Sequence, residues 1–174
     1  HLEKIFQEES PSALMFVSVL GLVPDMNKIV ELCFEYDVIL LEDTCEAMGC
    51  EYKGKKLGTW GHIGCFSFEE KKCMTTGDGG MICSNDVNLI EPLKPYRWVG
   101  IDKDTWKRVQ TAEGSQENEA MHWHYEIFVL GYKYNMNDIM AAIGLVQLEK
   151  LDQMNARRRK VFKRYIKGVQ EIKE

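Results

Sequence analysis

The fold is decided by residues 38–80, which read VILLEDTCEAMGCEYKGKKLGTWGHIGCFSFEEKKCMTTGDGG. The stretch opens with an apolar run that ends in two acids, and a second apolar run is followed by two acids and two lysines. Short continuous apolar runs are typical of strands that are buried on both faces of a sheet. Polar side chains just past two such strands predict a ligand site at one edge of that sheet.

The residues before this stretch complete a strand–helix–strand unit. Residues 13–20 (ALMFVSVL) form another continuous apolar run, which predicts a further strand buried on both faces. Residues 26–36 repeat apolar side chains at helical spacing, and Pro24 and Asp25 suit the first helical turn. Strands joined through a helix pair in parallel with a right-handed crossover, so the unit predicts a parallel sheet.

The rest of the chain extends the same architecture. We predict an exposed loop or small hairpin at 51–58, strands at 63–68 and 81–84, and helices from Asp86 to about Trp98, from Asp138, and from about Asp152 to the end. Residues 1–12 are mixed and polar, and the long polar stretch 100–119 has the character of a functional or mobile loop. Together these elements predict an α/β domain with a mostly parallel sheet and flanking helices.

The composition excludes two classes of partner. A chain of 174 residues with 45% hydrophobic and 28% charged residues is ordinary for one globular domain. Its net charge of −5 offers no basic footprint for nucleic acid, and no stretch reaches the ~18 apolar residues of a membrane-spanning helix. We interpret the basic cluster at 156–165 (ARRRKVFKRY) as a solvated helix face. We therefore expect neither a nucleic acid nor a membrane as partner.

The cysteines lie singly in the sequence, without the short paired spacing of zinc sites, so we predict no metal site. Several of them fall inside apolar runs. We therefore expect buried free thiols in a reducing cytoplasm rather than disulfides. The six residues are Cys33, Cys45, Cys50, Cys65, Cys73 and Cys83.

Three side chains near the strand ends have the chemistry of a cofactor site. Asp43 follows one strand, Ser67 ends the next, and Lys72 comes five residues later. Taken singly, Asp43 fits a helix cap or loop acid, and the adjacent lysines Lys71 and Lys72 fit a solvated turn. Pyridoxal phosphate (PLP) requires a lysine that forms a Schiff base, an acid at the pyridine nitrogen, and donors for its phosphate. Taken together, Lys72, Asp43 and Ser67 match these requirements.

Several motifs in the same order resemble the DegT/DnrJ/StrS family of PLP-dependent nucleotide-sugar aminotransferases. They are EDTCEAMGCEYKGKKLGTWGHIGCFSF at 42–68, followed by K-x-x-TTGDGGM, and LGYKYNMNDIMAAIGLVQLEKLDQMNARRR at 130–159. The resemblance implies the fold-type-I aminotransferase architecture and pyridoxal 5′-phosphate as cofactor. It also implies a homodimer whose active sites are built at the subunit interface.

The resemblance assigns a role to each matching residue. Asp43 is expected at the pyridine nitrogen, and Glu46 beside the cofactor ring and its 3-hydroxyl. Ser67 is expected to bind the phosphate. Lys72 is expected to form the internal aldimine and then to move protons, with Lys71 only as its neighbour.

Two further residues are implied to reach the phosphate across the dimer, and one pair departs from the family pattern. Lys133 stands where members commonly carry asparagine, and Asn135 is the alternative contact. Glu69 and Glu70 stand where members usually carry His-Pro or Tyr-Pro, which adds negative charge near the site.

The implied reaction is amino transfer from glutamate to a nucleotide-linked keto-deoxy-sugar. A sister group of sugar 3-dehydratases has histidine in place of the lysine, so Lys72 favours the aminotransferase. Members of the family are longer than this chain. We therefore expect residues 1–174 to be a single partial domain, the central part of the PLP-binding large domain, without its N-terminal segment and C-terminal small domain. The remaining alternative is a truncated or degenerate member without catalysis.

Overall fold

The computed structural model describes residues 1–101 and 125–172. They form two compact units, one made of His1–Asn85 with Asn137–Glu174 and the other of Asp86–Met136. Residues 102–119 of the predicted long loop lie outside the described residues.

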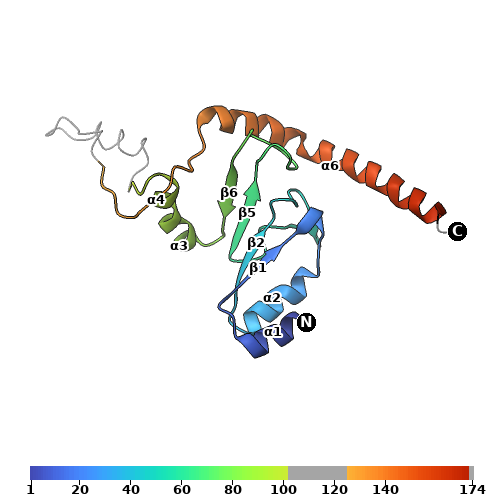
Figure 1. Ribbon diagram of the computed structural model, residues 1–174, viewed down its shortest axis with the longest axis horizontal. Helices are drawn as coiled ribbons and strands as arrows, with labels where there is room; N and C mark the ends of the chain where they lie inside the picture. Colours follow the sequence, from blue (N-terminus) through green and yellow to red (C-terminus); the bar gives the residue numbers. More distant parts are fainter. Residues whose placement is uncertain (102–124, 173–174) are drawn as a thin grey trace. The chain divides into compact units, whose positions relative to one another are not determined.

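A four-stranded sheet forms the centre of the first unit (Figure 1). Its order is β1-β2-β5-β6, where β1–β2 and β2–β5 pair in parallel and β5–β6 pair antiparallel. The predicted α/β fold with a mostly parallel sheet is therefore confirmed. The strands are β1 Ala13–Val17, β2 Ile39–Asp43, β5 Ile63–Ser67 and β6 Gly80–Cys83.

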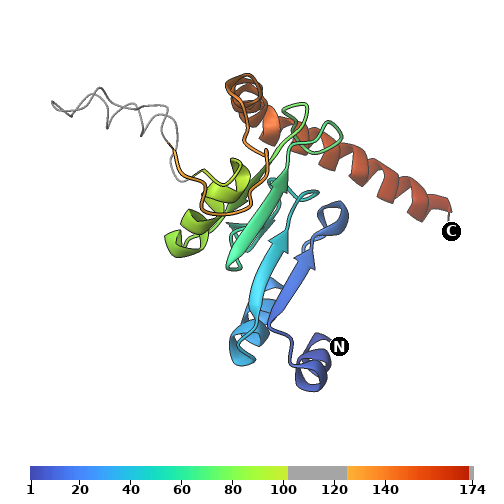
Figure 2. The same cartoon turned by 60° about the vertical axis from the view of Figure 1, so that its left-hand side comes forward.

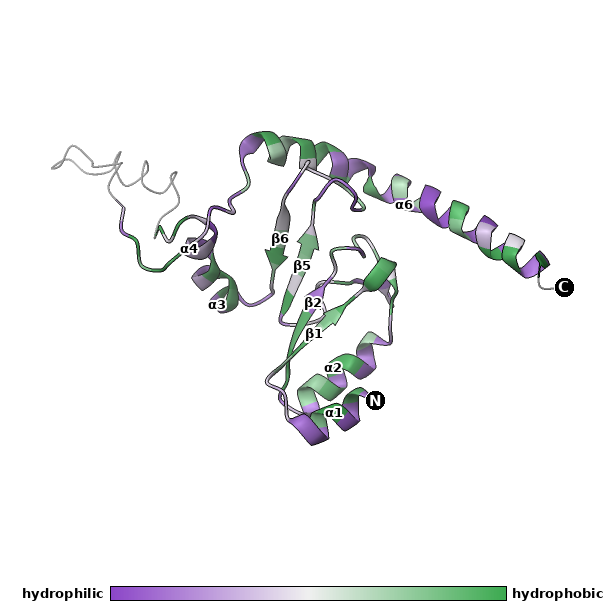
Figure 3. Cartoon of the chain, viewed as in Figure 1, coloured by the Kyte–Doolittle hydropathy of each residue, from purple (hydrophilic) through white to green (hydrophobic). Residues whose placement is uncertain are grey.

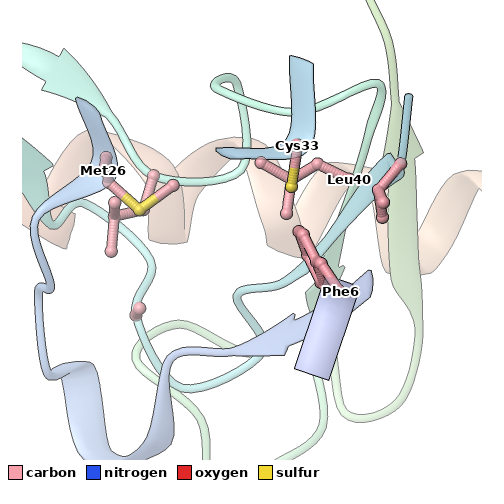
Figure 4. Close-up of a cluster of buried hydrophobic side chains, with 7 residues drawn as sticks. Phe6, Met26, Cys33 and Leu40 are labelled. Atoms are coloured by element: carbon pink, nitrogen blue, oxygen red, sulfur yellow. The ribbon is translucent and has the colours of Figure 1, made fainter. Parts of the chain in front are cut away.

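The predicted crossover helix is α2, Met26–Glu35, between β1 and β2. Asp25 caps it, since its carboxylate accepts the Lys28 N–H at 3.3 Å. The buried side chains of α2, Met26 and Cys33, join the core with Leu40 of β2. Figure 4 shows these side chains in one buried cluster with Phe6.

Phe6 belongs to a helix that the polar sequence at 1–12 did not predict. This helix, α1, spans Leu2–Glu9, and Phe6 is its one buried residue. The Phe6 ring meets Tyr36 edge-on, with centroids 5.7 Å apart. A single aromatic anchor is enough to dock a short polar helix, but it creates no apolar periodicity for a sequence pattern to detect.

Strand β1 is not buried on both faces, which corrects the prediction for this run. Figure 3 shows it hydrophobic along its length. However, Leu14 and Phe16 pack against the core cluster, whereas Met15 and Val17 are 59% and 46% exposed. The core cluster that contains Phe6 of α1 and Cys33 of α2 packs on the Leu14 face. The apolar composition of a strand does not reveal which neighbour covers each face.

The segment 51–58 forms the small hairpin that was one of its two predicted alternatives. Strands β3, Glu51–Tyr52, and β4, Lys55–Lys56, pair antiparallel. Lys53 and Gly54 form the turn between them, and both have positive φ, 48° and 80°. Two central residues with positive φ are typical of the type I′ turn, whose twist matches that of the strands.

The second unit begins where Asp86 caps a helical segment by accepting the Asn88 N–H at 2.8 Å. The predicted helix to Trp98 is broken into three short turns. Pro92 and Pro95 each lie at the start of a new turn, because proline lacks the N–H that continues a helix. The turns are α3 Val87–Ile90, η2 Glu91–Leu93 and α4 Lys94–Arg97.

One continuous helix, α6, replaces the two predicted after Asn137. It spans Asp138–Ile172, 35 residues, and returns to the first unit. Asn137 caps it by accepting the Met140 N–H at 2.9 Å. The expected break near Asp152 is absent because QLEKLDQMNA (147–156) contains no glycine or proline. No helix among the described residues is both long and apolar enough to cross a membrane.

Candidate active site

Asp43 and Ser67 lie at the carboxyl ends of two neighbouring parallel strands. Asp43 is the last residue of β2 and Ser67 the last of β5. In the register of the two strands Asp43 is opposite Cys65, so Ser67 lies two residues further on. Carboxyl ends of parallel strands are where open α/β sheets bind ligands. The predicted placement of both residues is confirmed.

Lys72 and Glu46 meet although they are 26 residues apart in the sequence. Lys72 Nζ lies 3.5 Å from Glu46 Oε1, with 26% and 40% of the two side chains exposed. The other carboxylate oxygen accepts the Leu20 N–H at 2.8 Å. That backbone hydrogen bond, together with the charge and hydrogen bond of Lys72, holds the pKa of Glu46 below its usual value, against a smaller opposing effect of burial. The carboxylate is therefore ionised and held from two sides.

Cys45 connects Asp43 to this pair. Burial, followed by a hydrogen bond to Asp43 and the charge of that carboxylate, raises the pKa of the Cys45 thiol to about 12. The charge of Lys72 acts on the same thiol in the opposite direction. An acid, a neutral thiol and an amine thus share one region beyond the sheet. Asp43 also accepts the Cys45 N–H at 3.1 Å, which is the loop-acid role that its sequence position allowed.

A tight turn joins Ser67 to Lys72. The Ser67 hydroxyl accepts the Glu69 N–H at 3.3 Å, and the Glu69 carbonyl accepts the Lys72 N–H at 3.0 Å. The Glu69 carboxylate accepts the Lys71 N–H at 3.0 Å. Glu69, which departs from the family pattern, therefore stabilises the turn through its own hydrogen bonds.

The GDGG run that follows is a tight turn, as predicted. Gly77 and Gly79 have φ of 89° and 134°, values that glycine adopts without strain. The Gly79 N–H donates to the Asp78 side chain at 2.8 Å. The turn returns the chain into β6, beside β5.

Glu42 is a structural residue that the sequence analysis did not single out. Its side chain is fully buried, and its carboxylate accepts three backbone N–H groups, from Gly58 at 2.7 Å, Trp60 at 2.6 Å and Gly61 at 2.7 Å. Successive strand residues point to opposite faces, so Glu42 and Asp43 serve opposite sides of β2. The signal available in the sequence was an acid next to Asp43 within an apolar strand, a position where a buried charge requires partners.

Lys133 and Asn135 belong to the second unit, whereas Asp43, Glu46, Ser67 and Lys72 belong to the first. The Lys133 ammonium lies 3.6 Å from the centroid of the Trp98 ring, a cation–π contact. The two backbones form a bridge at the same positions, Trp98 with Lys133. The contact that the structure gives Lys133 is therefore aromatic.

A cavity of about 290 Å³ lies at the opposite, amino end of β2. Cys33, Phe34, Leu40, Trp60 and His62 are among its lining residues. His62 Nδ1 accepts the Leu40 N–H at 3.0 Å, which occupies that ring nitrogen. None of the predicted site residues lines this cavity, so the candidate active site is the cluster at the carboxyl ends.

Both a family model and individual proteins match most of this chain. A model of the DegT/DnrJ/EryC1/StrS aminotransferase family matches residues 1–174. The uncharacterized protein MJ1066 of Methanocaldococcus jannaschii is 42% identical over 157 residues, which is 90% of this chain and 39% of that protein. GDP-perosamine synthase of Escherichia coli O157:H7 is 37% identical over 160 residues, 92% of this chain and 39% of that enzyme.

A solved structure extends the likeness to three dimensions. The E. coli GDP-4-keto-6-deoxy-D-mannose-3-dehydratase with bound hydrated PLP matches with a TM-score of 0.73 at 27% identity, over 92% of this chain and 41% of that one. Together with the family match, this likeness confirms the predicted α/β architecture of the PLP-dependent aminotransferases, with a mostly parallel sheet. The chain spans about two fifths of the length of the proteins it matches.

Proposed function

Because this chain belongs to the DegT/DnrJ/EryC1/StrS aminotransferase family, we propose that it forms the catalytic centre of a PLP-dependent sugar aminotransferase. The proposed substrate is a nucleotide-linked keto-deoxy-sugar, and the proposed amino donor is glutamate. The single observation that carries the proposal is the Lys72–Glu46 pair, 3.5 Å apart, beyond the strand that ends in Asp43.

The donor set suits pyridoxal phosphate. The cofactor would supply an electron sink for carbanion chemistry, and the protein would supply binding, orientation and charge. Asp43, the last residue of β2, would hold the pyridine nitrogen protonated. Ser67, at the end of β5, would donate its hydroxyl to the phosphate.

Lys72 would attach the cofactor and move protons. Attachment to a carbonyl requires a primary amine, which lysine provides and an imidazole does not. The Glu46 carboxylate holds the Lys72 amine in an ion pair. This ion pair would break when the cofactor binds beside the Glu46 carboxylate. As a general acid–base group, Lys72 would transfer a proton between donor or substrate carbon and cofactor.

A sugar 3-dehydratase is the second candidate, because two of the matching structures are of such enzymes. The amine of Lys72 favours amino transfer over that reaction. A third alternative is a family member without catalysis, in which the same residues only stabilise the fold.

The assembly would be a homodimer with shared active sites in the cytoplasm. Lys133 or Asn135 of one copy would reach the cofactor phosphate of the other. The Lys133 ammonium would have to leave the Trp98 ring to do so, which makes Asn135 the simpler donor.

The test is a comparison of two adjacent lysines in the whole protein. Lys72→Ala should abolish the visible absorbance that develops when PLP is added, whereas Lys71→Ala should retain it. Borohydride reduction followed by peptide mass spectrometry should find the cofactor on Lys72. Loss of absorbance in Lys71→Ala alone would overturn the assignment. Conversion of a 4-keto-sugar to a deoxy product without an amino group, with glutamate oxidised to its keto acid and its nitrogen released as ammonia, would favour the dehydratase.

A further inference from the structure

Helix α6 lies across the loops that carry the candidate catalytic residues. Both views place it beyond the carboxyl end of β5 (Figures 1 and 2). Leu151 is 6% exposed there. A Cβ added to Gly144 would approach Thr76 to 2.9 Å, and one added to Gly49 would approach Asn155 to 2.6 Å. The helix is therefore in close contact with the chain that follows β2 and the chain that follows β5.

One face of α6 makes these contacts. Gly144, Leu151, Asn155 and Arg158 are spaced by seven, four and three residues, so they lie along one side of the helix. The two polar members of this face, Asn155 and Arg158, donate to the loops that carry Glu46 and Lys72. Both acceptors are backbone carbonyls, so these hydrogen bonds do not depend on which side chain the accepting residue carries.

Asn155 and Arg158 join two separate loops. Asn155 Nδ2 donates to the Met48 carbonyl at 3.0 Å, and Arg158 Nη2 donates to the Cys73 carbonyl at 3.0 Å. Arg158 Nη1 donates to Asn155 Oδ1 at 2.7 Å, which links the two side chains. Met48 lies two residues after Glu46, and Cys73 directly follows Lys72. The hydrogen bonds thus link the loop that carries Glu46 to the loop that carries Lys72.

We infer that Asn155 and Arg158 are positioning residues, which hold the Glu46 loop and the Lys72 loop at a set separation. The link between the two loops does not depend on the proposed function, but its effect on cofactor binding does. Residues 156–165 are all exposed, so the prediction of a solvated helix face is confirmed, and Arg158 donates to the Cys73 carbonyl from that face. Arginine suits this role since its planar guanidinium presents two donors in a rigid fork, whereas lysine presents one point charge.

The test uses backbone hydrogen exchange in the whole protein without added cofactor. In Arg158→Ala, peptides covering 44–50 and 69–76 should exchange faster by about tenfold, a factor that corresponds to ~1.4 kcal/mol. Asn155→Ala should affect the same peptides, and the double variant should add little, because the two side chains act as one unit. Arg157→Ala, one residue away on the same helix, is the matched control and should leave both peptides unchanged.

A second measurement separates positioning from general stability. Arg158→Ala should raise the dissociation constant for PLP about tenfold while the thermal unfolding midpoint stays close to that of Arg157→Ala. Arg158→Lys, which retains one donor for the Cys73 carbonyl, should recover part of the affinity.

The two proposals fail in different ways. If exchange of the two peptides is the same in Arg158→Ala and Arg157→Ala, the positioning role is wrong, whatever PLP does. If exchange accelerates as expected but neither the wild-type protein nor any variant binds PLP, the positioning role stands and the proposed function is wrong.

Discussion

Lys72 Nζ lies 3.5 Å from Glu46 Oε1, and the second oxygen of that carboxylate accepts the Leu20 N–H at 2.8 Å. Leu20 has a φ of 53°, a left-handed conformation that is uncommon for a residue with a branched side chain. The Glu46 carboxylate therefore fixes the turn after β1 as well as the lysine. One side chain organises the ends of three segments of the chain.

Glu46→Gln should remove a stability contribution that depends on pH. The pKa of Glu46 is lowered in the folded chain, so the contribution is complete above about pH 4.3, the ordinary carboxyl pKa, and is lost as pH falls through the lower folded value. The thermal unfolding midpoint of Glu46→Gln should thus lie below that of the wild type at pH 7, and the two midpoints should converge in acid. Glu31→Gln, an exposed position on α2, is the control. A difference that persists unchanged in acid would contradict the prediction.

Glu42→Ala should destabilise the fold more than any exposed carboxylate substitution. It leaves the Gly58, Trp60 and Gly61 N–H groups without their acceptor, and a buried donor without a partner costs about 1–3 kcal/mol. We expect a loss of at least ~3 kcal/mol in urea unfolding. The control Glu51→Gln breaks an exposed ion pair with Lys56 and should cost about 0–1 kcal/mol. Equal losses in the two variants would contradict the role of Glu42.

The Cys45 thiol should resist alkylation because its pKa is raised to about 12 by burial and by Asp43. The thiolate is the nucleophile, so iodoacetamide at pH 8.5 should label Cys45 slowly in the folded protein and rapidly in urea, where an ordinary thiol has a pKa of about 8.5. Asp43→Asn removes the neighbouring negative charge and should accelerate labelling of Cys45. Peptide mass spectrometry measures both rates, and a folded protein in which Cys45 reacts as fast as in urea would refute the prediction.

The 174-residue chain by itself should bind PLP weakly. Glu46 and Lys72 are 40% and 26% exposed at the side chain, so little of the described chain encloses them. A site open to water weakens each polar contact with a ligand. Titration of the chain alone, followed by visible absorbance, should show no saturation at stoichiometric PLP. Tight one-to-one binding would contradict this expectation.

Local features of the sequence were enough to predict the strands and the polar residues at their ends. Apolar runs followed by acids and glycines located β2 and β5, so the sequence alone predicts Asp43 and Ser67 at strand ends. The prolines at 92 and 95 were equally visible, and they broke a helix that was predicted as continuous. The polar α1 was missed because its docking rests on Phe6 alone.

The sequence by itself determined the α/β fold, the family and the identity of the candidate catalytic residues, since these depend on patterns within short stretches. Only the tertiary structure decided which of those residues touch. It paired Glu46 with Lys72, buried Glu42 under three N–H groups, and brought Arg158 to the Cys73 carbonyl, 85 residues away in the chain. Such contacts arise from how strands and helices pack, and the spacing of residues along the chain does not record them.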